Sequence, residues 1–194
     1  MKFDFDFSNE VSLVTGAGRG IGLAISKKLA GLGSSVALMA RSSEELQIAA
    51  NEINANGGKA HVFSCDVSDL DSVKQNVKEI ENRLGSIKYL VNNAGVTGAP
   101  GRDWEVDPIR WWRTMEINVK GAFNCSHAVL KHMVERRQGR IVNVSSSSAE
   151  LIIPFMSSYG VSKAALTHLT TSSAEAAREF GVSIFSYCPG LVRT

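Results

Sequence analysis

Tyr159 and Lys163 stand four positions apart in the stretch "SSYGVSKAAL", residues 157–166. Side chains with this spacing share one face of a helix. A phenol is a poor base at neutral pH, but an ammonium group beside it favours the phenolate form. The two side chains could therefore act together in transferring a proton. A Tyr and Lys pair of this spacing is also common on helix surfaces, and these residues alone leave both interpretations open.

A glycine-rich stretch, "VTGAGRGIG" at residues 14–22, joins a predicted strand to a predicted helix. Its glycines, at 16, 18, 20 and 22, differ in spacing from the G-x-G-x-x-G fingerprint but keep its physical properties. They permit a tight turn, let backbone approach a pyrophosphate, and aim a helix N-terminus at negative charge. The stretch therefore predicts a dinucleotide site, with a tight connection within an α/β protein as the alternative.

The residues after the second predicted strand bear on which dinucleotide binds. A carboxylate at this place binds the ribose of NAD, whereas an arginine accommodates the 2′-phosphate of NADP. The sequence has Ala40 and then Arg41, with its next acidic residue at Glu44, and Arg19 of the glycine loop would lie on the same side. Two guanidinium groups can clamp a phosphate. We expect NADP(H), with NAD(H) less favoured; two solvated surface arginines are the alternative.

Polar residues also end the later strands. Asp66, in "CDVSD", is placed either to bond an adenine edge or to cap the next helix, and "NNAG" at 92–95 either lines the ligand crevice or makes a turn. Ser146 lies in "SSSSAE", 145–150, at the end of the fifth predicted strand. If these three residues lie in one crevice with a nicotinamide, Ser146 would supply an oxyanion donor and Tyr159 a proton donor. Lys163 would supply a charge that tunes the proton donor.

Alternating strands and helices must position these side chains. Apolar runs predict strands at 11–15, 35–40, 60–65, 88–93, 140–145 and 182–188, and amphipathic stretches predict helices at 21–32, 43–56, 69–84, 108–136 and 158–180. The strands are apolar on both faces, as in a parallel sheet covered by helices. We expect an α/β fold, a Rossmann-type doubly wound parallel sheet with helices on both faces. The sequence contains no linker, so 1–194 is expected to form a single dinucleotide-binding and catalytic domain.

The composition argues against several classes of function. The formal net charge is +2 and the basic residues are scattered, which does not favour nucleic-acid binding. The three cysteines lack CxxC spacing and the four histidines share no ligand spacing, so neither a disulfide framework nor a metal site is indicated. The sequence has an acidic N-terminus and no apolar run long enough to cross a bilayer. We expect a cytoplasmic protein that binds neither metal nor membrane.

Taken together, the motifs resemble the short-chain dehydrogenase/reductase (SDR) family over the whole chain. The matching stretches are "TGAGRGIG" (15–22) for T-G-x-x-x-G-x-G, "NNAG" (92–95), the Asn of "MEINVKG" at 118, Ser146, "YGVSK" (159–163) for Y-x-x-x-K, and "PGLVRT" (189–194). The resemblance implies an NADP(H)-dependent oxidoreductase that transfers a hydride between nicotinamide and a ketone or secondary alcohol. A non-catalytic NADP-binding sensor or scaffold protein on the same fold is the alternative.

The resemblance also implies roles for the catalytic residues. Tyr159 would be the general acid/base, Lys163 would favour its phenolate and hold the nicotinamide ribose, and Ser146 would bind the substrate oxygen. The family spacing, thirteen residues before the tyrosine, selects Ser146, with Ser145 and Ser147 as the alternatives. Asn118 would interrupt the helix of 108–136, and its backbone would hold a water that connects Lys163 to solvent. A helix asparagine with an internal hydrogen bond is the alternative reading of Asn118.

The implied cofactor contacts fall into five groups along the chain. They are the pyrophosphate loop (Gly16, Arg19, Gly20, Ile21, Gly22), the 2′-phosphate site (Arg41), the adenine site (Asp66, Val67), the adenosine ribose wall (Asn93, Ala94, Gly95), and the nicotinamide end (Tyr159, Lys163, Pro189, Gly190, Thr194). Family members continue with a substrate loop, a helix and a seventh strand, so the C-terminal strand and substrate loop are expected to be missing. Small residues of the 158–180 helix would let another helix approach closely, and the resemblance implies a homodimer or homotetramer.

Overall fold

Six parallel strands form one sheet in the computed structural model, which describes residues 5–192. The strands are β1 (Val11–Thr15), β2 (Ser35–Ala40), β3 (Lys59–Ser64), β4 (Ile87–Asn92), β5 (Gly139–Val144) and β6 (Val182–Tyr187). Their spatial order is β3-β2-β1-β4-β5-β6, and every pairing is parallel. The direction of winding reverses between β1 and β4. In open α/β sheets, ligands bind at the carboxyl ends of the strands beside this reversal.

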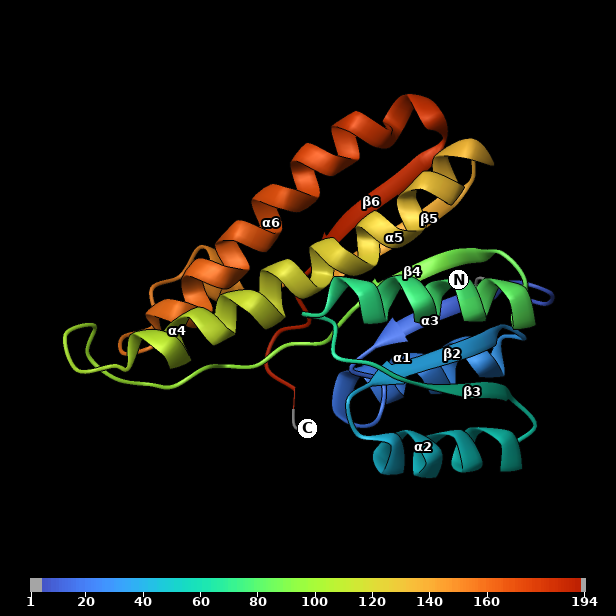
Figure 1. Ribbon diagram of the computed structural model, residues 1–194, viewed down its shortest axis with the longest axis horizontal. Coiled ribbons are helices and arrows are strands. Elements are labelled where there is room, and N and C mark those ends of the chain that lie inside the picture. Colours follow the sequence, from blue (N-terminus) through green and yellow to red (C-terminus); the bar gives the residue numbers. More distant parts are fainter. Residues whose placement is uncertain (1–4, 193–194) are drawn as a thin grey trace.

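The main helices cover both faces of the sheet (Figure 1). They are α1 (Gly20–Gly31), α2 (Ser43–Ala55), α3 (Leu70–Leu84), α4 (Pro108–Met115), α5 (Gly121–Glu135) and α6 (Ser157–Ala177). One core cluster joins α3, α5 and the end of α6 to one face, and a second joins α1 and α2 to the other. Neighbouring strand residues such as Leu13 and Val14 are both fully buried, on opposite faces. The expected doubly wound Rossmann-type sheet is confirmed.

Side-chain caps set the start of three helices. Ser42 Oγ accepts a hydrogen bond from the amide of Glu45 at the start of α2, and Asp69 caps α3. Asp107 caps α4 and is followed by Pro108, a residue suited to the first position of a helix. The starts of these three helices therefore follow from local sequence.

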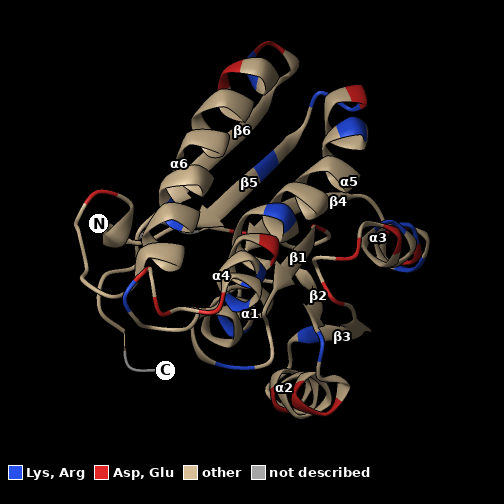
Figure 2. Cartoon of the chain, turned by 60° about the vertical axis from the view of Figure 1, so that its left-hand side comes forward, with Lys and Arg blue, Asp and Glu red and all other residues tan. Residues whose placement is uncertain are grey.

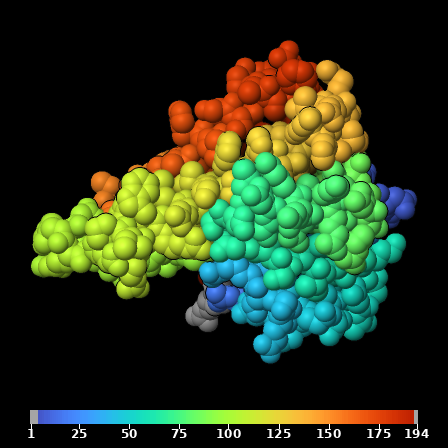
Figure 3. Space-filling view, in the orientation of Figure 1, coloured from blue at the N-terminus to red at the C-terminus, as the bar shows by residue number. Residues whose placement is uncertain are grey.

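The long helix predicted at 108–136 is divided in the structure. A π-helix, η1 (Glu116–Lys120), separates α4 from α5. Together with the segment that precedes it, α4 projects beyond the sheet, which is visible as the yellow-green lobe of the space-filling view (Figure 3). Single π-turns inside helices occur frequently at functional sites, and this one contains Asn118.

Charged residues of both signs are interspersed over the elements (Figure 2). Among the described residues, no three His, Cys, Asp or Glu side chains gather as they would around a metal ion. None of the helices in residues 5–192 combines the length and apolar character that a membrane span requires. All three cysteines are free, with Cys65 and Cys125 buried and Cys188 exposed.

Candidate active site

Helix α6 places Tyr159 and Lys163 on neighbouring turns, close to the carboxyl end of β5. Lys163 is only 5% exposed, and its Nζ donates a 2.8 Å hydrogen bond to the carbonyl oxygen of Val144, the last residue of β5. The same Nζ lies 5.7 Å from the centre of the Tyr159 ring. Burial lowers the pKa of Lys163 to about 8, because desolvation penalises the ammonium. Lys163 is therefore mainly charged near pH 7 and loses its proton above about pH 8.

Asn118 joins the π-helix to the turn after β4. Its side chain is 1% exposed, and it pairs with both backbone groups of Val96: Oδ1 accepts from the amide at 2.8 Å and Nδ2 donates to the carbonyl at 2.9 Å. Nδ2 also donates to Ser162 Oγ on α6 at 2.9 Å. A Cβ added at Gly95 would lie 3.2 Å from Asn118 Oδ1 and 3.6 Å from Lys163 Nζ. The expected interruption at Asn118 is confirmed, and Gly95, Asn118 and Lys163 lie together.

The serines after β5 point in different directions. Ser145 is buried, and its Oγ shares a 2.8 Å hydrogen bond with Thr167 Oγ1 on α6. Ser146 is half-buried and caps the short 3-10 helix η2 (Ser147–Ala149), accepting at Oγ from the amide of Ser148 at 3.2 Å. A Cβ added at Gly160 would lie 3.3 Å from the carbonyl oxygen of Ser148, so this turn packs against Gly160, the residue that follows Tyr159. The hydroxyl of Ser145 is thus buried in a hydrogen bond to α6, while Ser146 stays partly accessible.

The glycine loop fits closely against the turn after β4. Gly16 has a φ of +62°, and a Cβ there would lie 2.9 Å from Ala94 Cα. A Cβ on Gly22 would lie 2.2 Å from the carbonyl oxygen of Gly16 and 2.5 Å from Asn93 Nδ2. Asn93 Nδ2 donates to the carbonyl oxygens of Thr15 and Gly16 at 3.0 and 3.2 Å. These contacts fix the loop, and they leave no room for larger residues.

A cavity of about 480 Å³ opens beside this loop. It is lined by Gly16, Gly18, Arg19, Ala40, Arg41, Ser42, Glu45, Cys65, Asp66, Val67, Ala94, Gly95, Val96 and Ile117. The N-terminus of α1 adjoins it without a capping side chain or an acidic residue in its first turn, which suits a bound anion. The cavity therefore fits the adenosine diphosphate part of a dinucleotide. It combines glycines at positions where side chains would otherwise fill the space, two arginines and an uncapped helix end.

Glu45 is a cavity residue that the sequence analysis did not single out. Its Oε2 lies 3.9 Å from Arg19 Nε, with the two side chains 51% and 85% exposed. Arg19, Arg41 and Glu45 all line the cavity. This side of the cavity, where the sequence predicts the 2′-phosphate site, therefore contains two guanidinium groups and one carboxylate.

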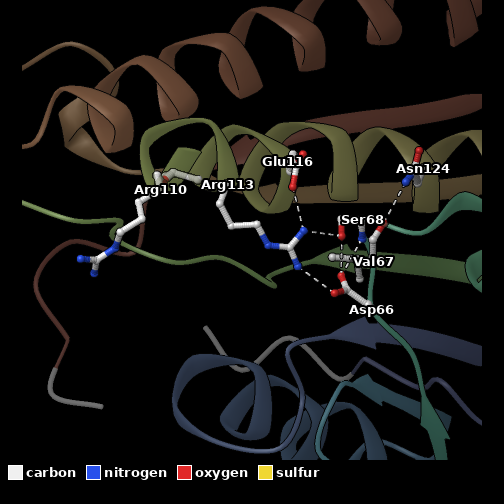
Figure 4. Close-up of polar contacts among 8 residues, drawn as sticks. Asp66, Val67, Ser68, Arg110, Arg113, Glu116 and Asn124 are labelled. Carbon is white, nitrogen blue, oxygen red and sulfur yellow. Dashed lines mark hydrogen bonds and ion pairs between the residues drawn. The ribbon is translucent and has the colours of Figure 1, made fainter. Parts of the chain in front are cut away.

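Asp66 lies in a network of hydrogen bonds at the other side of the cavity (Figure 4). Its Oδ1 accepts from the amide and the hydroxyl of Ser68 at 2.9 and 2.7 Å, and its Oδ2 pairs with Arg113 Nη2 at 2.8 Å. Burial raises the pKa of Asp66, but the hydrogen bonds from Ser68 and the contact with Arg113 outweigh it and lower that pKa overall. The helix cap at α3 is Asp69, so the alternative reading of Asp66 as a cap is wrong.

The other expected cofactor residues do not line this cavity. Gly20, Ile21 and Gly22 belong to α1. The side chain of Asn93 is hydrogen-bonded to the backbone of the glycine loop. Pro189 and Gly190 follow β6, beside the end of β5. Thr194 lies outside the described residues.

Two further polar residues were missed by sequence reasoning. Thr15 Oγ1 accepts hydrogen bonds from the amides of Asn93 and Ala94, both at 3.0 Å, and so joins the carboxyl ends of β1 and β4. The signal for Thr15 was present, because this residue opens "TGAGRGIG". Arg113 had no such signal, since its partner Asp66 is distant in sequence.

The chain matches known proteins over its length. A family model described as short chain dehydrogenase matches residues 10–194. A short chain dehydrogenase of Pseudocercospora fijiensis is 36% identical over 194 residues, covering 100% of this chain and 63% of that protein. The chain thus spans just under two thirds of that relative's length.

Two solved structures with bound nicotinamide dinucleotides are similar to this fold. An NAD+-bound xylitol dehydrogenase has a TM-score of 0.92 and 35% identity, covering 95% of this chain and 71% of that one. A metagenomic short-chain oxidoreductase in complex with NADP has a TM-score of 0.91 and 35% identity, covering 99% and 86%. With the family match and the geometry above, these findings show that the chain belongs to the short-chain dehydrogenase/reductase family.

Proposed function

We propose that the protein is an NADP(H)-dependent oxidoreductase that interconverts a ketone and a secondary alcohol, with Tyr159 as its general acid/base. The observation that carries the proposal is the placement of a buried lysine beside Tyr159. Gly95 lines the cavity and lies close to Asn118 and Lys163, so the cavity adjoins this pair. A Rossmann-type cavity positions a cofactor, and the protein supplies orientation and proton transfer.

The residues of this chain have distinct tasks in the proposed reaction. When bound, nicotinamide supplies or accepts the hydride at the carbon of the substrate. In reduction, the Tyr159 hydroxyl donates a proton to the carbonyl oxygen; in oxidation, its phenolate accepts one from the alcohol. The ammonium of Lys163 favours the phenolate, and Ser146 Oγ donates a hydrogen bond to the substrate oxygen. Asn118 holds the Val96 backbone and Ser162, the residue before Lys163, through its hydrogen bonds.

The preference for NADP(H) is supported by Arg19 and Arg41 at the cavity wall. A guanidinium binds phosphate oxygens through paired hydrogen bonds, and a ribose hydroxyl offers no comparable charge. The change Arg41→Asp should shift the preference from NADPH toward NADH, because a carboxylate repels the 2′-phosphate and accepts from the hydroxyl. The ratio of the two dissociation constants, from dihydronicotinamide fluorescence, checks this.

Turnover separates the proposed enzyme from a protein that binds NADP only as a sensor or scaffold. The experiment follows NADPH oxidation with a panel of ketones, using protein that has first been shown to bind NADPH. Consumption of NADPH that depends on the ketone supports the enzyme. Tight NADPH binding with no turnover on any ketone or secondary alcohol supports the sensor instead.

A second copy of the chain is the proposed partner, forming a homodimer or, through further contacts, a homotetramer. Small side chains face outward on α6, among them Ala164, Ser172 and Ala176, and Phe123 is half exposed on α5. Small residues permit close approach of helices. The change Ser173→Arg, in the groove between α5 and α6, should yield monomers in light scattering, whereas an unchanged mass would contradict this contact.

A cytoplasmic location, supported by the free cysteines, stays a prediction.

A further inference from the structure

We propose that Arg113 is a positioning residue that holds the Asp66 carboxylate ready to accept a hydrogen bond from the exocyclic amine of adenine. The inference rests on the proposed function, because it requires a bound adenine dinucleotide. Arg113 belongs to α4 and does not line the cavity. Through Asp66 it would determine how one wall of the cavity recognises the base.

The hydrogen bonds of Asp66 leave one acceptor position open on a defined oxygen. A carboxylate oxygen has two lone-pair positions. Oδ1 accepts from the amide and hydroxyl of Ser68, while Oδ2 accepts only from Arg113 Nη2 among the described residues. The remaining position of Oδ2 suits one further donor, and Asp66 lines the cavity. An amino group of adenine is such a donor, whereas a carbonyl oxygen at the same place would be repelled.

The guanidinium of Arg113 is itself fixed by three contacts. Nη1 donates to Ser68 Oγ at 2.9 Å and to Glu116 Oε2 at 2.8 Å, and Nη2 donates to Asp66 Oδ2 at 2.8 Å. The planar fork of an arginine favours one orientation of the carboxylate that it binds. Figure 4 shows Arg113 extending between Glu116 and the Asp66–Ser68 turn. Glu116 opens the π-helix that contains Asn118, so this guanidinium links that π-helix to the Asp66–Ser68 turn.

The backbone of the turn is held independently of Arg113. Asn124 Nδ2 donates to the carbonyl oxygen of Val67 at 2.9 Å, and a Cβ added at Gly121 would lie 2.5 Å from Val67 Cγ2. Loss of the Arg113 side chain should therefore leave the turn in place and free the rotation of the Asp66 carboxyl group. The effect should fall on recognition of the base more than on folding.

The test compares two ligands that differ at one group of the base. NADPH carries the adenine amine, and deamino-NADPH carries hypoxanthine, with an oxygen at that place. The variants are Arg113→Met and the matched control Arg110→Met. Arg110 lies one turn earlier on α4, is exposed, and has no ion pair within the described part of the chain; Figure 4 shows its side chain pointing away from the Asp66 network. Dissociation constants come from dihydronicotinamide fluorescence.

We expect the wild type and Arg110→Met to bind NADPH about tenfold more tightly than deamino-NADPH, as for loss of a hydrogen bond to a charged acceptor. In Arg113→Met this ratio should fall to about twofold or less. The milder change Ser68→Ala, which removes a partner of both Asp66 and Arg113, should give an intermediate ratio. It also keeps the test valid if Arg113→Met does not fold.

The results that would overturn this proposal differ from those that would overturn the proposed function. A ratio that is unchanged in both Arg113→Met and Ser68→Ala, whatever the change in overall affinity, overturns the positioning role of Arg113. Equal binding of the two ligands by the wild type overturns it as well, yet leaves the proposed oxidoreductase intact. Failure of the folded wild type to bind either dinucleotide contradicts the proposed function itself.

Discussion

Lys163 Nζ lies 5.7 Å from the centre of the Tyr159 ring and is bound to the carbonyl oxygen of Val144. One bond to a strand end therefore fixes a cation one turn from the phenol. Helix α6 supplies the spacing and β5 supplies the anchor, so the pair depends on how α6 packs on the sheet.

The pH dependence of turnover should report on Lys163. Because burial lowers the pKa of Lys163 to about 8, the ammonium that favours the phenolate is lost as the pH rises through that value. We expect kcat/KM for ketone reduction to fall above about pH 8, since this parameter reports ionisations of the free enzyme. The measurement is a pH profile of initial rates. A flat profile well above pH 8 would show that this charge is not needed.

The burial of Lys163 should also reduce stability. Its pKa is about 8 in the folded protein against 10.5 as the ordinary value, so between these values the unfolded chain binds more protons. Stability attributable to this group therefore rises with pH across that window. We expect Lys163→Met to increase the free energy of unfolding near pH 7 by about 1–3 kcal/mol, with a smaller gain near pH 10. Urea unfolding of the cofactor-free protein at both pH values checks this, and a loss of stability at neutral pH would refute it.

The strands were predictable from sequence because each is a short apolar run flanked by turn residues. Every predicted strand agrees with the structure to within one residue at either end. The site was less predictable. The division of the 108–136 helix at Asn118 followed from family resemblance and not from periodicity, and the Arg113 and Asp66 pair forms only when α4 packs near the end of β3.

Glu45 illustrates a further limit of sequence reading. The order Ser42, Glu45 has the form of a capping box, in which the Glu side chain returns to the cap residue. Here the Ser42 half of the box is present, but the Glu45 carboxylate lies near Arg19. Local pattern predicted the helix start and could not predict which way the side chain would turn.

Removing the Glu45 charge should strengthen NADPH binding. The carboxylate lies near Arg19 and would repel a 2′-phosphate in the same cavity. Both side chains are well exposed, so we expect only about a two- to fivefold gain in NADPH affinity for Glu45→Gln. The matched control is Glu44→Gln, which alters a neighbouring exposed residue that does not line the cavity. Titrations should show the gain for NADPH only, and it should shrink at high salt; an equal gain for NADH would contradict the repulsion.

Two glycines of α1 should respond oppositely to alanine. A Cβ at Gly22 would lie 2.2 Å from the Gly16 carbonyl oxygen, whereas a Cβ at Gly31 meets nothing within 4 Å. We expect Gly22→Ala to destabilise the protein by about 1–3 kcal/mol and to impair dinucleotide binding. Gly31→Ala should be neutral or stabilising by up to about 1 kcal/mol. Thermal unfolding of both variants is the measurement, and equal effects would show that the close approach at Gly22 is not required.

The central claim is that the Tyr159 hydroxyl transfers the proton while the rest of the site binds the cofactor. The most direct measurement is kcat for ketone reduction by Tyr159→Phe, with the NADPH dissociation constant measured on the same protein. We predict that kcat falls by about 10²–10⁴-fold while NADPH affinity stays near the wild-type value. A variant that binds NADPH normally and retains kcat within about tenfold of the wild type, less than a general acid contributes, would contradict the account.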